Sequence, residues 1–117
     1  PIINENDTVA TDEIKFGDND KLAGLTASLL SADILIIATN TDGIYTKASL
    51  STSSPKTIEI VSDLSELQHE IGDLKSTHGT GGMQSKIDAA TIAQQAGIET
   101  WITNAIENKS IFTKIKA

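Results

Sequence analysis

The sequence contains no cysteine and few aromatic residues, and these two absences limit what the chain can be. Without cysteine it can form neither a disulfide framework nor a thiolate catalytic site, so we expect a cytoplasmic protein. Aromatic residues make up only 3% of the 117 residues, so aliphatic side chains must build the core. A chain of this length can fold as one domain with a hydrophobic core.

The chain also lacks an excess of basic residues. Nine Lys and Arg residues against 16 Asp and Glu residues give a net charge of −7. Nucleic acids and anionic membrane surfaces attract basic proteins, so we expect neither as a partner. We recognise no signal peptide, and the longest apolar run, residues 34–38, suits a buried strand rather than a membrane span. The first residue is Pro1, and residues 2–3 read as the end of a strand, so we expect a piece of a longer protein.

Segments of helical and strand character alternate along the chain without internal repeats or low-complexity blocks. The pattern predicts a short hairpin at 13–16, helices at 20–31, 63–71, 83–96 and 110–117, and strands at 33–39, 57–61 and 98–103. The apolar run of strand 33–39 does not alternate with polar residues, which predicts burial on both faces. The expected fold is α/β, a three-layer αβα sandwich with a mainly parallel sheet.

The stretch HGTGGMQSKIDAA, residues 78–90, has three glycines in four positions and then becomes helical. Glycines let backbone N–H groups approach a ligand, and a helix N-terminus attracts negative charge, which together favour a phosphate site. Lys86 lies in the first helical turn, and its side chain leans back over the loop. The loop is not a Walker A motif, because Met-Gln-Ser separates Gly82 from Lys86. The alternative is a flexible glycine linker with a solvated lysine.

Two polar clusters lie before and at the start of the first predicted helix. Residues 4–8 follow a strand, and residues 18–20 begin the helix. Amides can hold a small polar ligand and a carboxylate can hold an ammonium, but the same residues also cap helices and form turns. Thr39 and Asn40 follow the most apolar strand, at the edge where α/β sheets bind ligands, unless they form a plain turn. The two histidines, His69 and His78, form no metal-ligand pattern, and we expect no protein-bound metal.

Four motifs of this sequence resemble the amino acid kinase family in their order and approximate spacing, and in particular the family members that phosphorylate glutamate. They span residues 1 to about 103 and read PIINENDTVAT, KFGDND, TDGIYT and GTGGMQSK. The resemblance implies a carbamate kinase-like fold, of which residues 1–117 would be an incomplete part: the nucleotide-binding half with part of the glutamate site. It implies transfer of the ATP γ-phosphate, with Mg²⁺, to the γ-carboxylate of L-glutamate, the first step of proline biosynthesis. It also implies a homo-oligomer for the full-length protein.

The resemblance further implies roles for individual residues. Asn4, Asp7 and Asn19 fall where the family contacts glutamate. Asp20 falls where the family has the aspartate that orients catalytic lysines, and Lys86 would support the transferring phosphoryl group. The residues that fall in the nucleotide site are Thr39, Asn40, Thr80, Gly81, Gly82, Met83, Gln84, Ser85 and Lys86.

The chain departs from the family pattern at two positions. Asn40 stands where an aspartate is usual, and Asp42 either compensates for that charge or only turns the chain. Asn104 stands where a glycine is usual. Three interpretations remain: part of an enzyme that is inactive as an isolated chain, a module that binds nucleotide without transfer, or a purely structural fragment. Members that act on aspartate or uridylate share the general scheme and remain alternatives.

Overall fold

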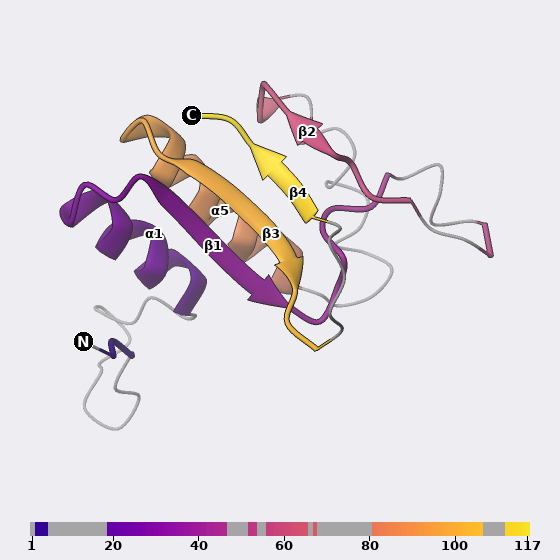
Figure 1. Cartoon of the computed structure of the whole chain (residues 1–117), viewed down its shortest axis with the longest axis horizontal. Helices are drawn as coiled ribbons and strands as arrows, with labels where there is room; N and C mark the ends of the chain where they lie inside the picture. Colours follow the sequence, from indigo (N-terminus) through magenta and orange to yellow (C-terminus); the bar gives the residue numbers. More distant parts are fainter. Residues whose placement is uncertain are drawn as a thin grey trace.

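The computed structural model describes residues 2–4, 19–46, 52–53, 56–65, 67, 81–106 and 112–117. Within these ranges the chain forms two long helices and four strands (Figure 1). Their order is α1 (Asn19–Leu29), β1 (Ile34–Thr39), β2 (Ile60–Val61), α5 (Gly81–Gln95), β3 (Glu99–Asn104) and β4 (Phe112–Ile115). The hairpin expected at 13–16, most of the helix expected at 63–71, and both histidines lie outside the described residues.

The four strands form one mixed sheet in the order β1-β3-β4-β2. β1 pairs with β3 and β2 pairs with β4 in parallel, whereas β3 and β4 are antiparallel. The expected α/β class with a mainly parallel sheet is therefore confirmed. Neither helix in the described ranges has the length and apolar character needed to cross a lipid bilayer.

The helix expected at 110–117 is wrong, because residues 112–115 form β4. Thr113 and Ile115 pair with Ile102 and Thr100 of β3, and all four side chains are buried. Alternate residues of a strand share one face, so Thr113 and Ile115 both lie on the covered face of the sheet. In so short a segment the same apolar residues also fit a helical spacing, so the sequence does not distinguish the two. Pairing with a distant strand overrides a weak local preference.

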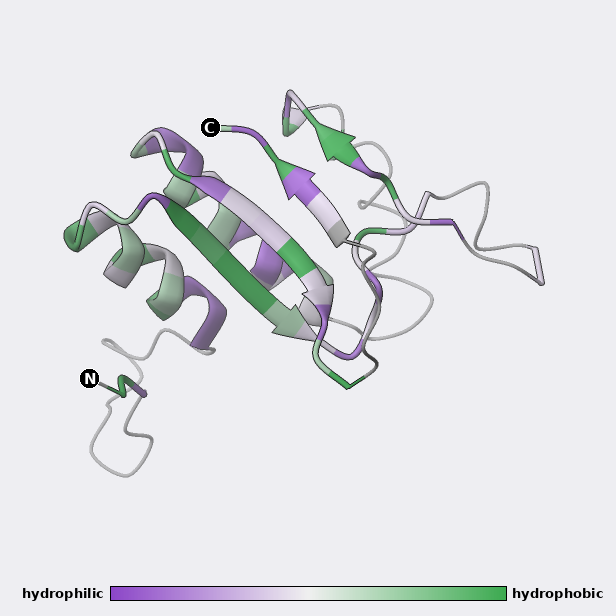
Figure 2. Cartoon of the chain, viewed as in Figure 1, coloured by the Kyte–Doolittle hydropathy of each residue, from purple (hydrophilic) through white to green (hydrophobic). Residues whose placement is uncertain are grey.

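Both helices cover the same face of the sheet, and they lie side by side (Figure 1). β1 is hydrophobic along most of its length (Figure 2), yet only alternate residues are covered. Leu35 and Ile37 are buried under the helices, while Ile34 and Ile36 are 43% and 58% exposed on the opposite face. The sequence pattern predicts burial of this strand on both faces. The described helices form one layer and cover only one face of it.

Small residues allow α1 and α5 to approach closely. A Cβ atom added to Gly24 would lie 2.8 Å from the backbone oxygen of Ala89. Ala27, Ala90 and Ala93 are buried in the same core. Since each helix leads back into a parallel strand of the same sheet, α1 and α5 also run parallel, and their first turns lie at the same end of the molecule.

Both helices end with a residue in the left-handed conformation. Ser31 has φ of 51° and Gly97 has φ of 75°. After Gly97, the Ile98 amide donates to the Ala93 carbonyl at 2.9 Å, which closes the helix end. The expected helix stop at Gly97 is confirmed, and it directs the chain into β3.

A fully buried threonine joins β4 to the segments that precede β2. The Thr113 hydroxyl accepts a hydrogen bond from the Ile44 amide at 2.9 Å and donates one to the Ile58 carbonyl. A Cβ at Gly43 would lie 2.5 Å from this hydroxyl oxygen, so only glycine fits there. The expected strand at 57–61 is present as an isolated bridge between Tyr45 and Thr57, followed by β2.

Candidate functional site

The central feature of the candidate site is an ion pair between the first turns of the two helices. Lys86 Nζ lies 3.0 Å from Asp20 Oδ2, and the two side chains are 15% and 25% exposed. The close approach at Gly24 and Ala89, one turn further along each helix, places these two residues side by side. A charge-assisted hydrogen bond of this length fixes an ammonium more firmly than a neutral contact would.

Two more groups complete the surroundings of this ion pair. The Ser85 hydroxyl lies 2.8 Å from Asp20 Oδ2 and 2.9 Å from the Gly82 carbonyl oxygen. Lys86 Nζ also lies 3.4 Å from the same carbonyl oxygen. An ammonium has three N–H donors, and these contacts occupy two of them within the described part of the chain. The third can meet an incoming anion.

Helix α5 begins inside the glycine-rich loop, at Gly81. Among the described residues outside the adjoining turn of α5, no heavy atom lies within 4 Å of a Cβ added to Gly82, so these residues leave the space beside this backbone open. The first N–H groups of a helix have no intrahelical acceptor and favour a bound anion. The geometry suits a phosphate held by backbone N–H groups and the Lys86 ammonium. Thr80, also expected at this site, lies outside the described residues.

The side chains of Met83, Gln84 and Ser85 are each engaged by other groups of the protein. Met83 packs against the hydrophobic core. The Gln84 amide donates to Asp88 Oδ1 at 2.9 Å, one turn along the same helix. Ser85 binds Asp20, as described above. A nucleotide at this loop would therefore meet backbone N–H groups and Lys86 rather than these three side chains.

Two of the three residues expected to contact the acceptor are brought together. The Asn19 side-chain amide donates to Asn4 Oδ1 at 2.8 Å, which links the segment 2–4 to the start of α1. Both side chains are exposed. Asp7, the third residue, lies outside the described residues. The structure thus places Asn4 at the start of α1, the helix that carries both Asn19 and Asp20.

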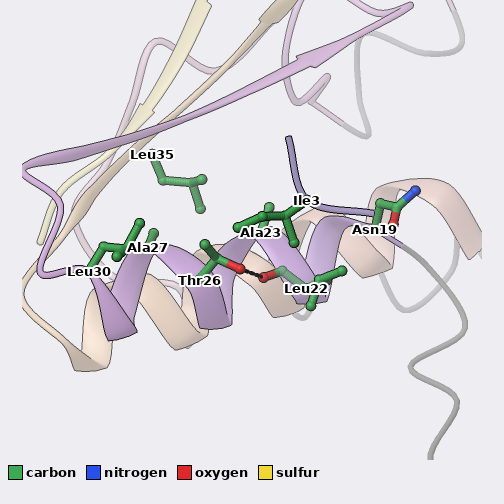
Figure 3. Close-up of a pocket in the computed structure, with 8 residues that line it drawn as sticks. All are labelled: Ile3, Asn19, Leu22, Ala23, Thr26, Ala27, Leu30 and Leu35. Carbon is green, nitrogen blue, oxygen red and sulfur yellow. Dashed lines mark hydrogen bonds between the residues drawn. The ribbon is translucent and has the colours of Figure 1, made fainter. Parts of the chain in front are cut away.

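A groove of about 280 Å³ runs beside this amide pair along α1 (Figure 3). Asn19 stands at one end of it and Leu30 at the other, and the Thr26 hydroxyl is bound to the Leu22 carbonyl at 2.8 Å. The described lining residues include no cation and are mainly apolar; they are Ile3, Asn19, Leu22, Ala23, Thr26, Ala27, Leu30 and Leu35. A charged amino acid would therefore bind at the amide end rather than along the groove.

The loops that follow β1 and β3 meet at the carboxyl edge of the sheet. The Asn104 amide donates to Asp42 Oδ1 at 3.0 Å, and the Ala105 N–H donates to the Thr39 carbonyl at 2.7 Å. The Thr39 hydroxyl is 3.4 Å from Asn40 Oδ1. Asp42 is therefore held by Asn104, which favours its role in shaping the turn over compensation for the charge missing at Asn40.

These groups all lie at one end of the molecule. The first turns of α1 and α5 and the carboxyl ends of β1 and β3 share this end, because each helix runs opposite to the strand that follows it (Figure 1). Ligands of open α/β sheets bind at such an edge. The start of α1 is also hydrophilic (Figure 2).

Comparison with known proteins identifies the family. Residues 1–104 match the amino acid kinase family. The chain belongs to this family. It is 50% identical over 104 residues to a glutamate 5-kinase of Cyanothece sp., and 51% identical over 105 residues to a glutamate 5-kinase of Thermoanaerobacter sp.. These alignments cover 88% and 89% of this chain but only 28% of each relative, so the chain spans about a quarter of their length. The resemblance found in the sequence is confirmed.

Solved structures of amino acid kinase-like proteins share the fold. A carbamate kinase from Giardia lamblia bound to AMP-PNP has a TM-score of 0.63 and 27% identity, over 85% of this chain and 32% of its own. A UMP kinase from Ureaplasma parvum has a TM-score of 0.62 at 15% identity, over 90% of this chain and 44% of its own. The carbamate kinase-like fold expected for this family member is therefore confirmed, in incomplete form.

Sequence reasoning gave no role to Lys21 or Asp88, which also link the two helices of this family member. Asp88 accepts from Gln84 and lies 3.7 Å from Lys21 Nζ, with Oδ2 facing the lysine. The spacing of four residues between Gln84 and Asp88 is a sign that could have been used, because such residues are neighbours on a helix. The pairing with Lys21 has no local sign, since it depends on how α1 and α5 pack.

Proposed function

We propose that this chain is the nucleotide-binding half of an amino acid kinase domain, with part of the acceptor site, in a longer glutamate 5-kinase. The complete enzyme would transfer the γ-phosphate of ATP to the γ-carboxylate of L-glutamate and form γ-glutamyl phosphate, the first step of proline biosynthesis. The observation that carries the proposal is the Asp20–Lys86 pair beside the open first turn of α5. The identity of about half the residues with glutamate 5-kinases supports the choice of acceptor.

The chemistry requires positioning and positive charge more than a nucleophilic side chain. The γ-carboxylate of glutamate is itself the nucleophile, and it must approach a negatively charged phosphate. The Lys86 ammonium and the N–H groups that begin α5 would offset this repulsion and the charge of the transition state. Asp20 would keep the ammonium in place through the 3.0 Å contact.

The remaining residues would bind the two substrates. Asn4 and Asn19, with Asp7, would contact the glutamate at the start of α1. The backbone of residues 80–86 would cradle the phosphates, and Thr39 with Asn40 would contact the nucleotide at the carboxyl edge of β1. Magnesium usually reaches such sites with the substrate phosphates and one or two carboxylates, so the proposal places Mg²⁺ with the ATP. The family relationship also supports a cytoplasmic homo-oligomer for the complete protein.

The proposal is tested with the protein encoded by the complete reading frame. It is incubated with ATP, Mg²⁺ and, in separate reactions, glutamate, aspartate or uridylate. We expect ADP release only with glutamate, together with an acyl phosphate that hydroxylamine traps as a hydroxamate. Transfer to aspartate or uridylate but not to glutamate would contradict the choice of acceptor. Tight ATP binding without transfer to any acceptor would instead make the protein a nucleotide-binding module.

A further inference from the structure

Ser85 has two acceptors but only one hydroxyl proton. Its oxygen lies 2.8 Å from Asp20 Oδ2 and 2.9 Å from the Gly82 carbonyl oxygen. A hydroxyl donates one hydrogen bond at a time, and a carboxylate is a stronger acceptor than a neutral carbonyl. The proton is therefore given to Asp20, across the interface between α1 and α5.

Ser85 and Lys86 bind the same carboxylate oxygen, but they differ in stiffness. Lys86 reaches Asp20 Oδ2 at 3.0 Å through a long side chain with four rotatable bonds. Ser85 reaches the same atom through one Cβ, so its oxygen moves with the α5 backbone. Of the two partners, the short side chain determines where the carboxylate lies, and the carboxylate then determines where the flexible ammonium lies.

We propose that Ser85 is a positioning residue that acts through Asp20 to hold the Lys86 ammonium at the phosphate site. This inference rests on the proposed kinase function. It differs from the nucleotide contact that family resemblance implies for Ser85, because the hydroxyl faces Asp20. The contact of Lys86 Nζ with the Gly82 carbonyl, at 3.4 Å, is longer than its contact with Asp20. A bound phosphate would draw Lys86 away from this carbonyl, while Ser85 keeps Asp20 in place.

A purely structural role for Ser85 has a matched comparison on the same helix. The Thr91 hydroxyl donates to the Ile87 carbonyl at 2.8 Å, which is the ordinary local hydrogen bond of a helical threonine. If Ser85 only satisfied the Gly82 carbonyl in the same way, the loss of either hydroxyl would have similar consequences. The variants Ser85→Ala and Thr91→Val therefore separate the two roles.

The test measures steady-state kinetics of the complete protein with ATP, Mg²⁺ and glutamate. Ser85→Ala should lower kcat by about 10- to 100-fold, the range for losing a hydrogen bond to a charged group, with smaller changes in both KM values. Ser85→Thr, which keeps the hydroxyl, should recover most of the activity, and Thr91→Val should stay within about threefold of wild type. Equal kcat values for Ser85→Ala and Thr91→Val would overturn the inference.

A double-mutant cycle tests whether Ser85 acts through Asp20. In an Asp20→Ala background, Ser85→Ala should lower kcat by less than about twofold, because the carboxylate that it positions is absent. Full additivity of the two substitutions would overturn the inference. If the complete protein transfers phosphate to none of the acceptors, the proposed function fails, and the same cycle is measured on the midpoint of thermal unfolding. Non-additive midpoints then support the Ser85–Asp20 contact, and additive midpoints refute it.

Discussion

Replacing Gly24 by alanine tests whether the close approach of α1 and α5 organises the site. The new Cβ would lie 2.8 Å from the Ala89 carbonyl oxygen, 3.2 Å from its Cα and 3.3 Å from its carbonyl carbon. All three are backbone atoms of a helix and cannot move by a side-chain rotation. The helices must therefore separate by roughly half an ångström to restore an ordinary contact.

Two opposing terms set the effect on stability. Alanine is favoured over glycine inside a helix by about 1 kcal/mol. Overpacking a well-packed interface costs about 1 to 3 kcal/mol. We therefore expect a net loss of about 1 kcal/mol in the free energy of unfolding.

The effect on the site should exceed the effect on stability. Asp20 lies one turn before Gly24, and Ser85 lies one turn before Ala89, so a separation at this crossing lengthens the 2.8 Å contact between Asp20 and Ser85. The short serine side chain cannot follow, whereas the long Lys86 side chain can. We expect kcat of the complete protein to fall by about tenfold or more, as for loss of a hydrogen bond to a charged group.

Thermal unfolding and kinase kinetics of the complete protein measure the two effects. Gly82→Ala is the control for stability, because a Cβ there meets no heavy atom of the described residues within 4 Å outside the adjoining helical turn. This variant should unfold at or slightly above the wild-type temperature. Ala89→Gly should not rescue Gly24→Ala, since the clash is with the backbone of Ala89. A Gly24→Ala protein that is more stable than wild type and fully active would refute the reasoning.

Four further predictions concern individual side chains. Lys86→Ala should largely remove the protection that ATP gives against thermal unfolding, because the ammonium lies 3.4 Å from the Gly82 carbonyl oxygen in the first turn of α5; equal protection in the variant would exclude this role. Asp20→Asn in the complete protein should unfold near the wild-type temperature, because its amide oxygen can still accept hydrogen bonds from Ser85 and Lys86, but should lose on the order of a hundredfold in kcat, because the charge that fixes the ammonium is gone. Near-normal kcat would show that the charge of Asp20 has no part in catalysis. Asn19→Ala should raise the KM for glutamate more than the KM for ATP, because its amide binds Asn4, the other described residue proposed to contact glutamate; unchanged glutamate kinetics would show that Asn19 only shapes the turn before α1. Thr113→Val should destabilise the protein by about 2 to 4 kcal/mol in the free energy of unfolding, because the buried Ile44 amide and the partly buried Ile58 carbonyl lose their partner; an unchanged midpoint of thermal unfolding would contradict this.

The sequence by itself determined the local features of this protein. The apolar run at 34–38 is a strand, the glycine-rich loop opens a helix, and Gly97 ends that helix with positive φ. Each of these features depends on a few neighbouring residues, through hydrophobic length or glycine conformational freedom. The family motifs are equally local, and they identified the amino acid kinase family without any knowledge of packing.

Only the tertiary structure decided how distant segments meet. Residues 112–115 became a strand because Thr113 and Ile115 pair with β3, and the outer face of β1 remained exposed because the described helices lie together on the other face. The contacts of Ser85 with Asp20 and of Asn104 with Asp42 join residues that are 65 and 62 positions apart. Such contacts depend on the crossing of two helices and the register of two strands. A linear pattern of propensity and polarity contains no information on the distance between these elements. The contacts of Asp20 with Ser85 and of Asp42 with Asn104 could therefore be known only once the chain had folded.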